Sequence, residues 1–239
     1  MINIKSTHEI ECMRKSGAIL RDCLLFLGDR VKPGVSTKRL DEFAYDYIKR
    51  HDSTPSFLGY GGFPGTICAS IDEVVVHGFP SDRRLKEGEI IGVDCGLVFK
   101  GWQADAARTF LVGEVSEEKK RLVDTTRESF FEGVKQFKAG GRLGDISHAV
   151  QVYNESRGYG VVRSMVGHGI GRDARRSCGA ELRQSRTWTE TRSGYGACNR
   201  TYGQYGHVAN ARGRLEMRHS RRQTFRSLRK HCCSDRKRS

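Results

Sequence analysis

Hydrophobic and polar residues follow two different rhythms along the first 173 residues of the chain. In four segments the apolar positions recur every three or four residues, which is the spacing of one buried helix face. These predicted helices span residues 6–27, 36–48, 117–137 and 145–157. Shorter runs rich in valine and isoleucine predict strands. They cover residues 66–70, 73–77, 89–99, 102–112 and 160–166.

The order of these elements is two helices followed by strands, written twice along the chain. A repeat of this kind predicts an α+β domain built from two similar halves. The second half would need several more strands after Asp173, and the sequence there has no alternating apolar pattern that predicts them. We therefore expect the second half of the fold to be incomplete.

Charge and aliphatic content change abruptly at the same place. The whole chain has a net charge of +14, and residues 174–239 alone contribute +13, with 15 Arg and two Lys against four acidic residues. The same segment contains only four residues of Ile, Leu or Val. So few aliphatic side chains cannot build a packed core. We expect a folded body, residues 1–173, and a basic tail, residues 174–239, that is disordered or translated out of frame.

The sequence argues against several classes of protein. No apolar run approaches the ~20 residues of a membrane span, and the polar N-terminus is unlike a signal peptide. Eight cysteines without a secretion signal predict reduced thiols. The lack of any C-x-x-C pair argues against a thiolate zinc site. We expect a cytoplasmic protein with no membrane partner.

Two aspartates stand out in the longest pair of predicted strands. Asp94 and Asp105 lie in runs joined by a predicted turn at residues 99–101. A turn centred there places the two carboxylates opposite each other on an antiparallel ladder, ~5 Å apart at Cβ. Buried carboxylates that close repel each other unless a cation lies between them, so the pair is a candidate for holding one metal ion or bridging two. A second interpretation leaves one of them in solvent or at the turn.

Two histidines occupy bends next to glycine. His168 is flanked by Gly167 and Gly169 at the end of a predicted strand, where the backbone can bend and leave space around the imidazole. His77 ends a β-branched run just before Gly78. Each histidine is a candidate ligand or substrate contact. Each also fits an ordinary histidine at a turn or a strand end.

Four ordered motifs together resemble type I methionine aminopeptidase. They are Val-His-Gly-Phe-Pro at 76–80, Val-Asp-Cys-Gly at 93–96, Gln-Ala-Asp-Ala-Ala-Arg-Thr-Phe at 103–110 and Gly-His-Gly-Ile-Gly-Arg at 167–172. The spacing between the aspartates and the following histidine also fits the family pattern. The resemblance runs over residues 1–173 without a gap. It implies the pita-bread fold, whose two pseudo-symmetric halves agree with the helix–helix–sheet repeat.

The resemblance also implies a metal centre and a reaction. In the family, two divalent ions (Co, Mn, Fe or Zn) activate a water molecule that attacks the first peptide bond and releases the initiator methionine. Asp94, Asp105 and His168 match three of the family's metal ligands, and Asp105 would bridge the two ions. The implied substrates are the N-termini of nascent polypeptides whose second residue is small.

The same resemblance assigns residues to substrate binding. His77 matches the histidine that contacts the substrate near the scissile amide. Tyr60, Phe63 and Cys68 fall where the family lines its pocket for the methionine side chain, although ordinary loop packing also accounts for these three. The implied enzyme is a monomer, and association with the ribosome stays open.

The sequence departs from the family after His168. A second histidine ligand is expected seven residues later, where the chain has Arg175. Two glutamate ligands are also missing, because the later glutamates lie in no strand-like or Glu-Pro context; they are Glu181, Glu190 and Glu216. The family gives proton transfer to one of those ligands, so no catalytic residue is assigned. We expect weakened or single-ion metal binding and impaired activity.

Three interpretations of the whole chain follow. A change of reading frame near residues 172–174 is the simplest, because out-of-frame translation of a GC-rich gene yields Arg, Gly, Ser, Thr and Cys without hydrophobic periodicity. A basic tail that binds nucleic acid or the ribosome is the second, since tyrosines lie among its arginines, at Tyr195, Tyr202 and Tyr205. The third is an inactive pita-bread protein that binds peptides without cleaving them.

Overall fold

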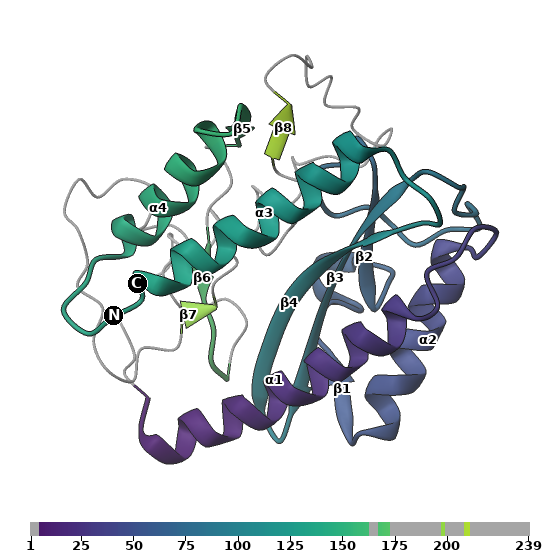
Figure 1. Cartoon of the computed structure of the whole chain (residues 1–239). Helices are drawn as coiled ribbons and strands as arrows, with labels where there is room; N and C mark the ends of the chain where they lie inside the picture. The colour runs from purple at the N-terminus through teal and green to yellow at the C-terminus, as the bar shows by residue number, and fades with distance from the viewer. Residues whose placement is uncertain (1–4, 163–166, 173–196, 199–207, 211–239) are drawn as a thin grey trace, which may run out of the picture.

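The computed structural model describes residues 5–162, 167–172, 197–198 and 208–210. The first half of the body is a four-stranded antiparallel sheet with two helices packed against it, α1 (Thr7–Gly28) and α2 (Thr37–Arg50) (Figure 1). The helix pair and the sheet form two layers with the hydrophobic core between them. In the described part of the chain, no helix is long and apolar enough to cross a membrane.

The start of α1 is fixed by a capping box. The Glu9 N–H donates to Ser6 Oγ, and the Ser6 N–H donates to Glu9 Oε2 at 2.8 Å, so two N–H groups at the helix start find partners. The helix then buries Leu20, Leu24 and Leu27 on one face. The predicted helix over residues 6–27 is thereby confirmed.

The sheet is organised around its longest inner strand, β3 (Ile90–Phe99). Strand β4 (Trp102–Leu111) pairs with one edge of β3 over its whole length. Strands β1 (Ser53–Pro55) and β2 (Ile67–Ile71) share the other edge. All three pairings are antiparallel, so β3 is hydrogen-bonded on both sides.

The hairpin between β3 and β4 closes through two residues, Lys100 and Gly101. Both have positive φ, 49° and 80° respectively. This pattern is typical of the tight hairpin turn whose twist matches that of the strands. The register that follows pairs Phe99 with Trp102 and continues without a bulge to Ile90 and Leu111.

The second half begins with two helices, α3 (Glu117–Lys135) and α4 (Leu143–Glu155), as the sequence predicted. They pack closely because Gly133 of α3 has no side chain to keep Val150 of α4 away. Two short strands follow, β5 (Tyr159–Val161) and β6 (His168–Gly169).

The predicted strand over residues 73–77 is wrong. Strand β2 ends at Ile71, and the chain turns at once through Asp72, which has φ 46°. The three valines that follow line a surface pocket and do not pair in the sheet. These β-branched side chains form an apolar pocket wall. In the sequence, a run of valines in such a wall looks the same as a short buried strand.

Two short strands lie in the segment after Asp173, where the sequence has no alternating apolar pattern. Strand β7 (Ala197–Cys198) pairs with β6, and β8 (Val208–Asn210) pairs with β5 (Figure 1). Strands of two or three residues need only backbone hydrogen bonds, so they form without an alternating apolar pattern.

Two leucines of α1 allow a test of which helix face packs in the core. Leu27 is fully buried and Leu25, in the same helix, is 46% exposed. We expect Leu27→Ala to lower the free energy of unfolding by about 2–5 kcal/mol, because it leaves a cavity, and Leu25→Ala by less than about 1 kcal/mol. Urea unfolding followed by circular dichroism measures both. Equal losses in the two variants would contradict this assignment of the core.

Candidate active site

Two buried carboxylates lie on neighbouring strands of the first half. Asp94, on β3, is 5% exposed, and the side chain of Asp105, on β4, is 9% exposed. The ladder pairs Asp94 with Ala107 and Asp105 with Gly96. The prediction that they lie directly opposite each other is therefore wrong: they are diagonal neighbours on one face of the sheet.

The physical reason is the position of the hairpin turn. Asp94 and Asp105 would pair only if the turn were centred between Phe99 and Lys100. The observed turn lies between Lys100 and Gly101, which shifts the ladder and moves Asp105 two positions along its strand from the residue opposite Asp94. Diagonal neighbours of this kind have Cα atoms about 7–8 Å apart and their side chains point to the same face. Both carboxylates therefore lie on one face of the sheet, where one group can contact them together.

His168 is brought to Asp105 from the second half of the chain. Its Nε2 atom lies 3.5 Å from Asp105 Oδ2. Its Nδ1 atom lies 2.9 Å from the carbonyl oxygen of Gly169, which can only accept, so Nδ1 carries a proton and donates. In the neutral imidazole this tautomer leaves the Nε2 lone pair facing the carboxylate, and that arrangement is favourable only when a cation or proton lies between them.

The segment that carries His168 is attached to the start of β4. The N–H of Gln103 donates to the carbonyl of Gly171 at 2.9 Å. The guanidinium of Arg172 lies 4.8 Å from the ring centroid of Trp102, a cation–π contact. Both contacts fall within three residues of Asp105, so they hold the histidine close to the carboxylate.

These donors fit one side of a divalent metal site. Two carboxylates and an imidazole are ligand types that Mn, Fe, Co and Zn accept. The Oδ1 atoms of Asp94 and Asp105 are buried and accept no hydrogen bond from the described residues, although both side chains make other interactions. Within those residues, no three His, Cys, Asp or Glu side chains are gathered closely enough to hold an ion. The described residues therefore supply some of the ligands of a metal site and do not form a complete ligand set.

His77 lies with Asp94 in a single surface pocket. The pocket is walled by the valines that follow Asp72 and by β-strand residues; its lining includes Ser70, Asp72, Val74, Val75, Val76, His77 and Asp94. His77 itself has φ 57°, a left-handed conformation that costs a non-glycine residue free energy. A strained backbone beside a buried carboxylate is typical of functional sites.

The three predicted methionine-pocket residues lie in different environments. Cys68 is buried on β2 directly beside Asp94 in the ladder. Phe63 packs edge-on between Phe57 and Phe79, with ring centroids 6.5 and 5.3 Å away. Tyr60 begins the short 3-10 helix η1 (Tyr60–Gly62) and is 41% exposed. The structure thus brings Cys68 to the carboxylates and places Phe63 in an aromatic cluster.

Phe57 and Phe79 are members of this cluster that sequence reasoning missed. Phe57 also covers the sheet at Gly96, where an added Cβ would lie 2.8 Å from the phenyl ring. Gly96 is the partner of Asp105 in the ladder, so the aromatic cluster reaches the carboxylates. The available signals were the position of Phe57 two residues before the glycine-rich loop, residues 59–65, and that of Phe79 within the motif at 76–80.

Asp41 is a second residue that the sequence did not single out. Its Oδ1 atom accepts the N–H groups of Thr66 and Ile67 at 2.7 and 2.9 Å, where the glycine-rich loop enters β2. Burial raises the pKa of this carboxyl, and the two N–H donors partly oppose that shift. Asp41 therefore fixes the end of the loop that carries Tyr60 and Phe63.

Cys95 follows Asp94 in the sequence, but its thiol is buried in the core. A hydrogen bond with the Cys23 thiol, together with full burial, raises the pKa of Cys95 well above its ordinary value. A thiol that stays protonated is a poor ligand and nucleophile. Cys95 therefore belongs to the core, although it is the neighbour of Asp94.

The sequence of this chain is similar to those of known metallopeptidases. The sequence matches the family described as Metallopeptidase family M24 over residues 11–195. It is 56% identical over 174 residues to the methionine aminopeptidase of Clostridium acetobutylicum, covering 72% of this chain and 70% of that protein. It is 44% identical over 173 residues to methionine aminopeptidase 1 of Bacillus subtilis, with coverage of 72% and 70%.

The structure of this chain is also similar to solved structures of such enzymes. The methionine aminopeptidase of Rickettsia prowazekii matches with a TM-score of 0.72 and 36% identity, covering 82% of this chain and 75% of that one. The prolidase of Pyrococcus furiosus matches with a TM-score of 0.62 at 19% identity, covering 82% of this chain and 53% of that one, which shows a shared fold alone. The predicted pita-bread fold is confirmed, and it is incomplete in the C-terminal part of this chain.

Substituting Gly78 will test whether the position of His77 depends on close backbone approach. A Cβ at Gly78 would overlap the carbonyl oxygen of Ala69, which is backbone and cannot move aside. Gly17, in α1, has nothing within 4 Å of its Cβ position. We expect Gly78→Ala to lower the melting temperature by about 4 °C or more, and Gly17→Ala to leave it unchanged or raise it. Differential scanning calorimetry compares them, and similar behaviour of both variants would contradict the close approach.

Proposed function

This chain belongs to the methionine aminopeptidases of metallopeptidase family M24, and on that premise we propose that its body removes the N-terminal methionine from nascent proteins whose second residue is small. The observation that carries the proposal is that Asp105 lies 3.5 Å from His168 and is the diagonal neighbour of Asp94, which lines one pocket with His77. These residues come from two strands, a loop and the second half of the chain.

We assign each residue a role in this reaction. Asp94, Asp105 and His168 would hold divalent metal, which supplies Lewis-acid activation of the peptide carbonyl and of water when it is bound. His77 would donate a hydrogen bond near the scissile amide and orient the peptide against the carboxylates. Phe63 and Cys68 would contact the methionine side chain. Tyr60 would do so from the glycine-rich loop.

The proposal includes impaired activity in this particular chain. The sequence lacks the second histidine and both glutamates of the family pattern, and it has Arg175 where that histidine is expected. Fewer anionic ligands lower the affinity for divalent ions, so a single weakly held ion is the proposed state. Proton transfer then lacks the carboxylate that the family pattern would supply.

We propose that the boundary at Asp173 marks a change of reading frame. The aligned lengths of 174 and 173 residues with the two relatives are close to the 173 residues of the body, which supports this interpretation. The nucleotide sequence around codon 173 tests it directly. A histidine codon and a later Glu-Pro in another frame would support it, and a uniform frame without them would favour an evolved basic tail. We place the protein in the cytoplasm as a monomer that acts on emerging chains.

A second candidate function is peptide binding without cleavage. The observation that favours it is the pocket around His77 together with the aromatic cluster; among the described residues, those that form the two belong to the body. This candidate predicts that a peptide such as Met-Ala-Ser binds equally well after Asp94→Asn and Asp105→Asn. The enzyme hypothesis predicts weaker metal-dependent binding in both variants.

Metal titration will test the ligand assignment without relying on turnover. We expect Mn²⁺ to bind the protein and Asp105→Asn to weaken that binding by about tenfold or more, because a neutral amide replaces an anionic ligand. Asp82→Asn is the matched control, since the Asp82 side chain is 93% exposed and pairs with Lys38 at the surface. Electron paramagnetic resonance of free Mn²⁺ gives the affinities. Equal affinity for Mn²⁺ in the two variants would contradict the assignment of Asp105 as a metal ligand.

Hydrolysis of Met-Ala-Ser in the presence of Mn, Co or Fe(II) will test the activity itself. We expect methionine release by this chain to be slower by at least about 100-fold than by a version whose reading frame is restored after codon 173. Equal rates would contradict the impairment. An inactive restored version would count against the aminopeptidase assignment.

A further inference from the structure

A long loop connects β2 to β3 and forms one wall of the pocket. We call residues 72–89 the strap. It contains neither helix nor strand, and it carries His77 and the three valines that face Asp94. Because a loop of this length is free to move unless it is attached, the position of His77 depends on the contacts that hold the strap.

The middle of the strap is attached to β2 at one point. The Ala69 N–H donates to the carbonyl of Gly78 at 2.8 Å, and the Gly78 N–H donates to Ser70 Oγ at 3.3 Å. These bonds place the residue after His77 against the edge of the sheet. They fix the strap next to His77. Further along, the N–H of Lys38 donates to the carbonyl of Ser81 and the N–H of Leu85 donates to the carbonyl of Val35, so the second part of the strap is held beside the start of α2. The part that carries His77 lies between these bonds and the beginning of the strap.

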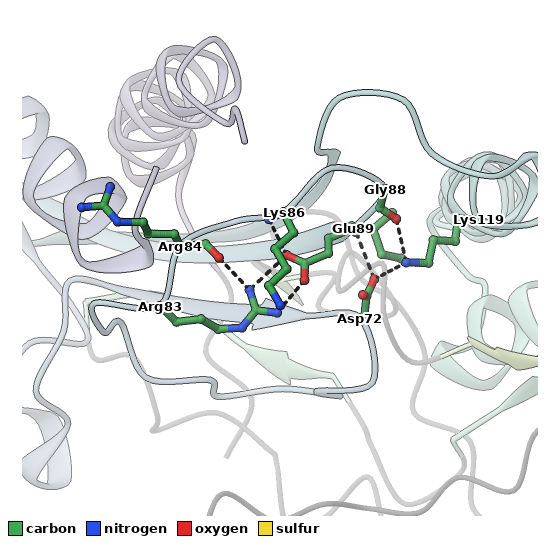
Figure 2. Close-up of polar contacts among 8 residues, drawn as sticks. Asp72, Arg83, Arg84, Lys86, Gly88, Glu89 and Lys119 are labelled. Atoms are coloured by element: carbon green, nitrogen blue, oxygen red, sulfur yellow. Dashed lines mark hydrogen bonds and ion pairs between the residues drawn. The ribbon is translucent and has the colours of Figure 1, made fainter. Parts of the chain in front are cut away.

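The two ends of the strap meet at a lysine from the second half of the domain. Figure 2 shows Lys119 of α3 reaching Asp72 at the beginning of the strap and Gly88 at its end. Lys119 Nζ lies 2.7 Å from Asp72 Oδ1 and donates to the carbonyl of Gly88 at 2.8 Å. Asp72 Oδ1 also accepts the N–H of Ile90, the first residue of β3. The N–H of Asp72 also donates to the carbonyl of Ile90, and the Lys119 ammonium group adds to this closure by joining the two ends of the strap to α3.

A second ion pair braces the same end of the strap. The guanidinium of Arg83 binds both carboxylate oxygens of Glu89, at 2.6 and 3.0 Å, and Glu89 Oε2 also accepts the N–H of Lys86 (Figure 2). The Arg83 guanidinium holds the pKa of Glu89 below its usual value. This pair joins residues within the strap and its last position, so it stiffens the strap without connecting it to α3.

Helix preference does not explain the lysine at position 119. Lys119 lies in the first turn of α3, at the end of the helix where the dipole favours acidic residues. Its side chain is 33% exposed and that of Asp72 is 24% exposed, so the pair is only partly screened by solvent. Its favourable contacts in the described residues are with the strap.

We propose that Lys119 is a positioning residue for peptide binding. By closing the strap through Asp72 and Gly88, it holds His77 and the valine wall against Asp94, so the substrate pocket of the first half depends on the placement of α3. This inference rests on the proposed role of His77 in peptide binding. The left-handed backbone of His77 would relax toward ordinary conformations once the base of the strap is released.

Hydrogen exchange and peptide binding together will test this role. We expect Lys119→Met to speed amide exchange in residues 73–79 by about tenfold and to weaken binding of a Met-Ala-Ser amide by a similar factor. Exchange in α1 will not change. Lys120→Met is the matched control, because Lys120 occupies the next position of the same helix turn and pairs with Glu117 at the surface. Lys119→Arg will restore most of the protection.

A second variant keeps the proposal testable if Lys119→Met does not fold. Asp72→Asn retains an oxygen for the Ile90 N–H and removes the charge that holds Lys119, and we expect the same local increase in exchange. Exchange in the strap that is identical in wild type, Lys119→Met and Asp72→Asn overturns the proposal. Faster exchange in the strap with unchanged peptide affinity also overturns it. If the wild-type protein does not bind the peptide, the proposed function of the site fails, and the exchange rates still decide whether Lys119 closes the strap.

Discussion

The two-residue turn at Lys100 and Gly101 fixes the register of the central hairpin, and the candidate site depends on that register. Every residue of β4 takes its partner on β3 from this turn. A shift of one residue would send Asp105 to the opposite face of the sheet, away from Asp94. The left-handed φ values of the turn therefore decide where both carboxylates lie.

The two halves of the domain are joined near the site by a few specific contacts. His168 faces Asp105, and the backbone of Gln103 holds Gly171. On the other side of the pocket, Lys119 closes the strap through Asp72. None of these contacts lies within one half alone. The site is therefore sensitive to the placement of the second half, although both carboxylates described for it, Asp94 and Asp105, come from the first.

The uneven distribution of charge has a different meaning for each part of the chain. The body is almost neutral, and its charged residues form local pairs such as Arg83 with Glu89. The excess of arginine begins where the family pattern of ligands ends. The net charge of +14 is therefore a property of the tail and gives no information about the partner of the folded body.

The sequence by itself determined the helices, the hairpin and the residue types of the site. Their signals are local: the Ser6–Glu9 capping box, the spacing of apolar residues, and Asp94, Asp105 and His168 within recognisable motifs. Only the tertiary structure decided the diagonal placement of the carboxylates, the loop conformation after Asp72 and the closure by Lys119. The reason is physical, because a turn's dihedral angles and an ion pair between residues 47 apart leave no periodic trace along the chain.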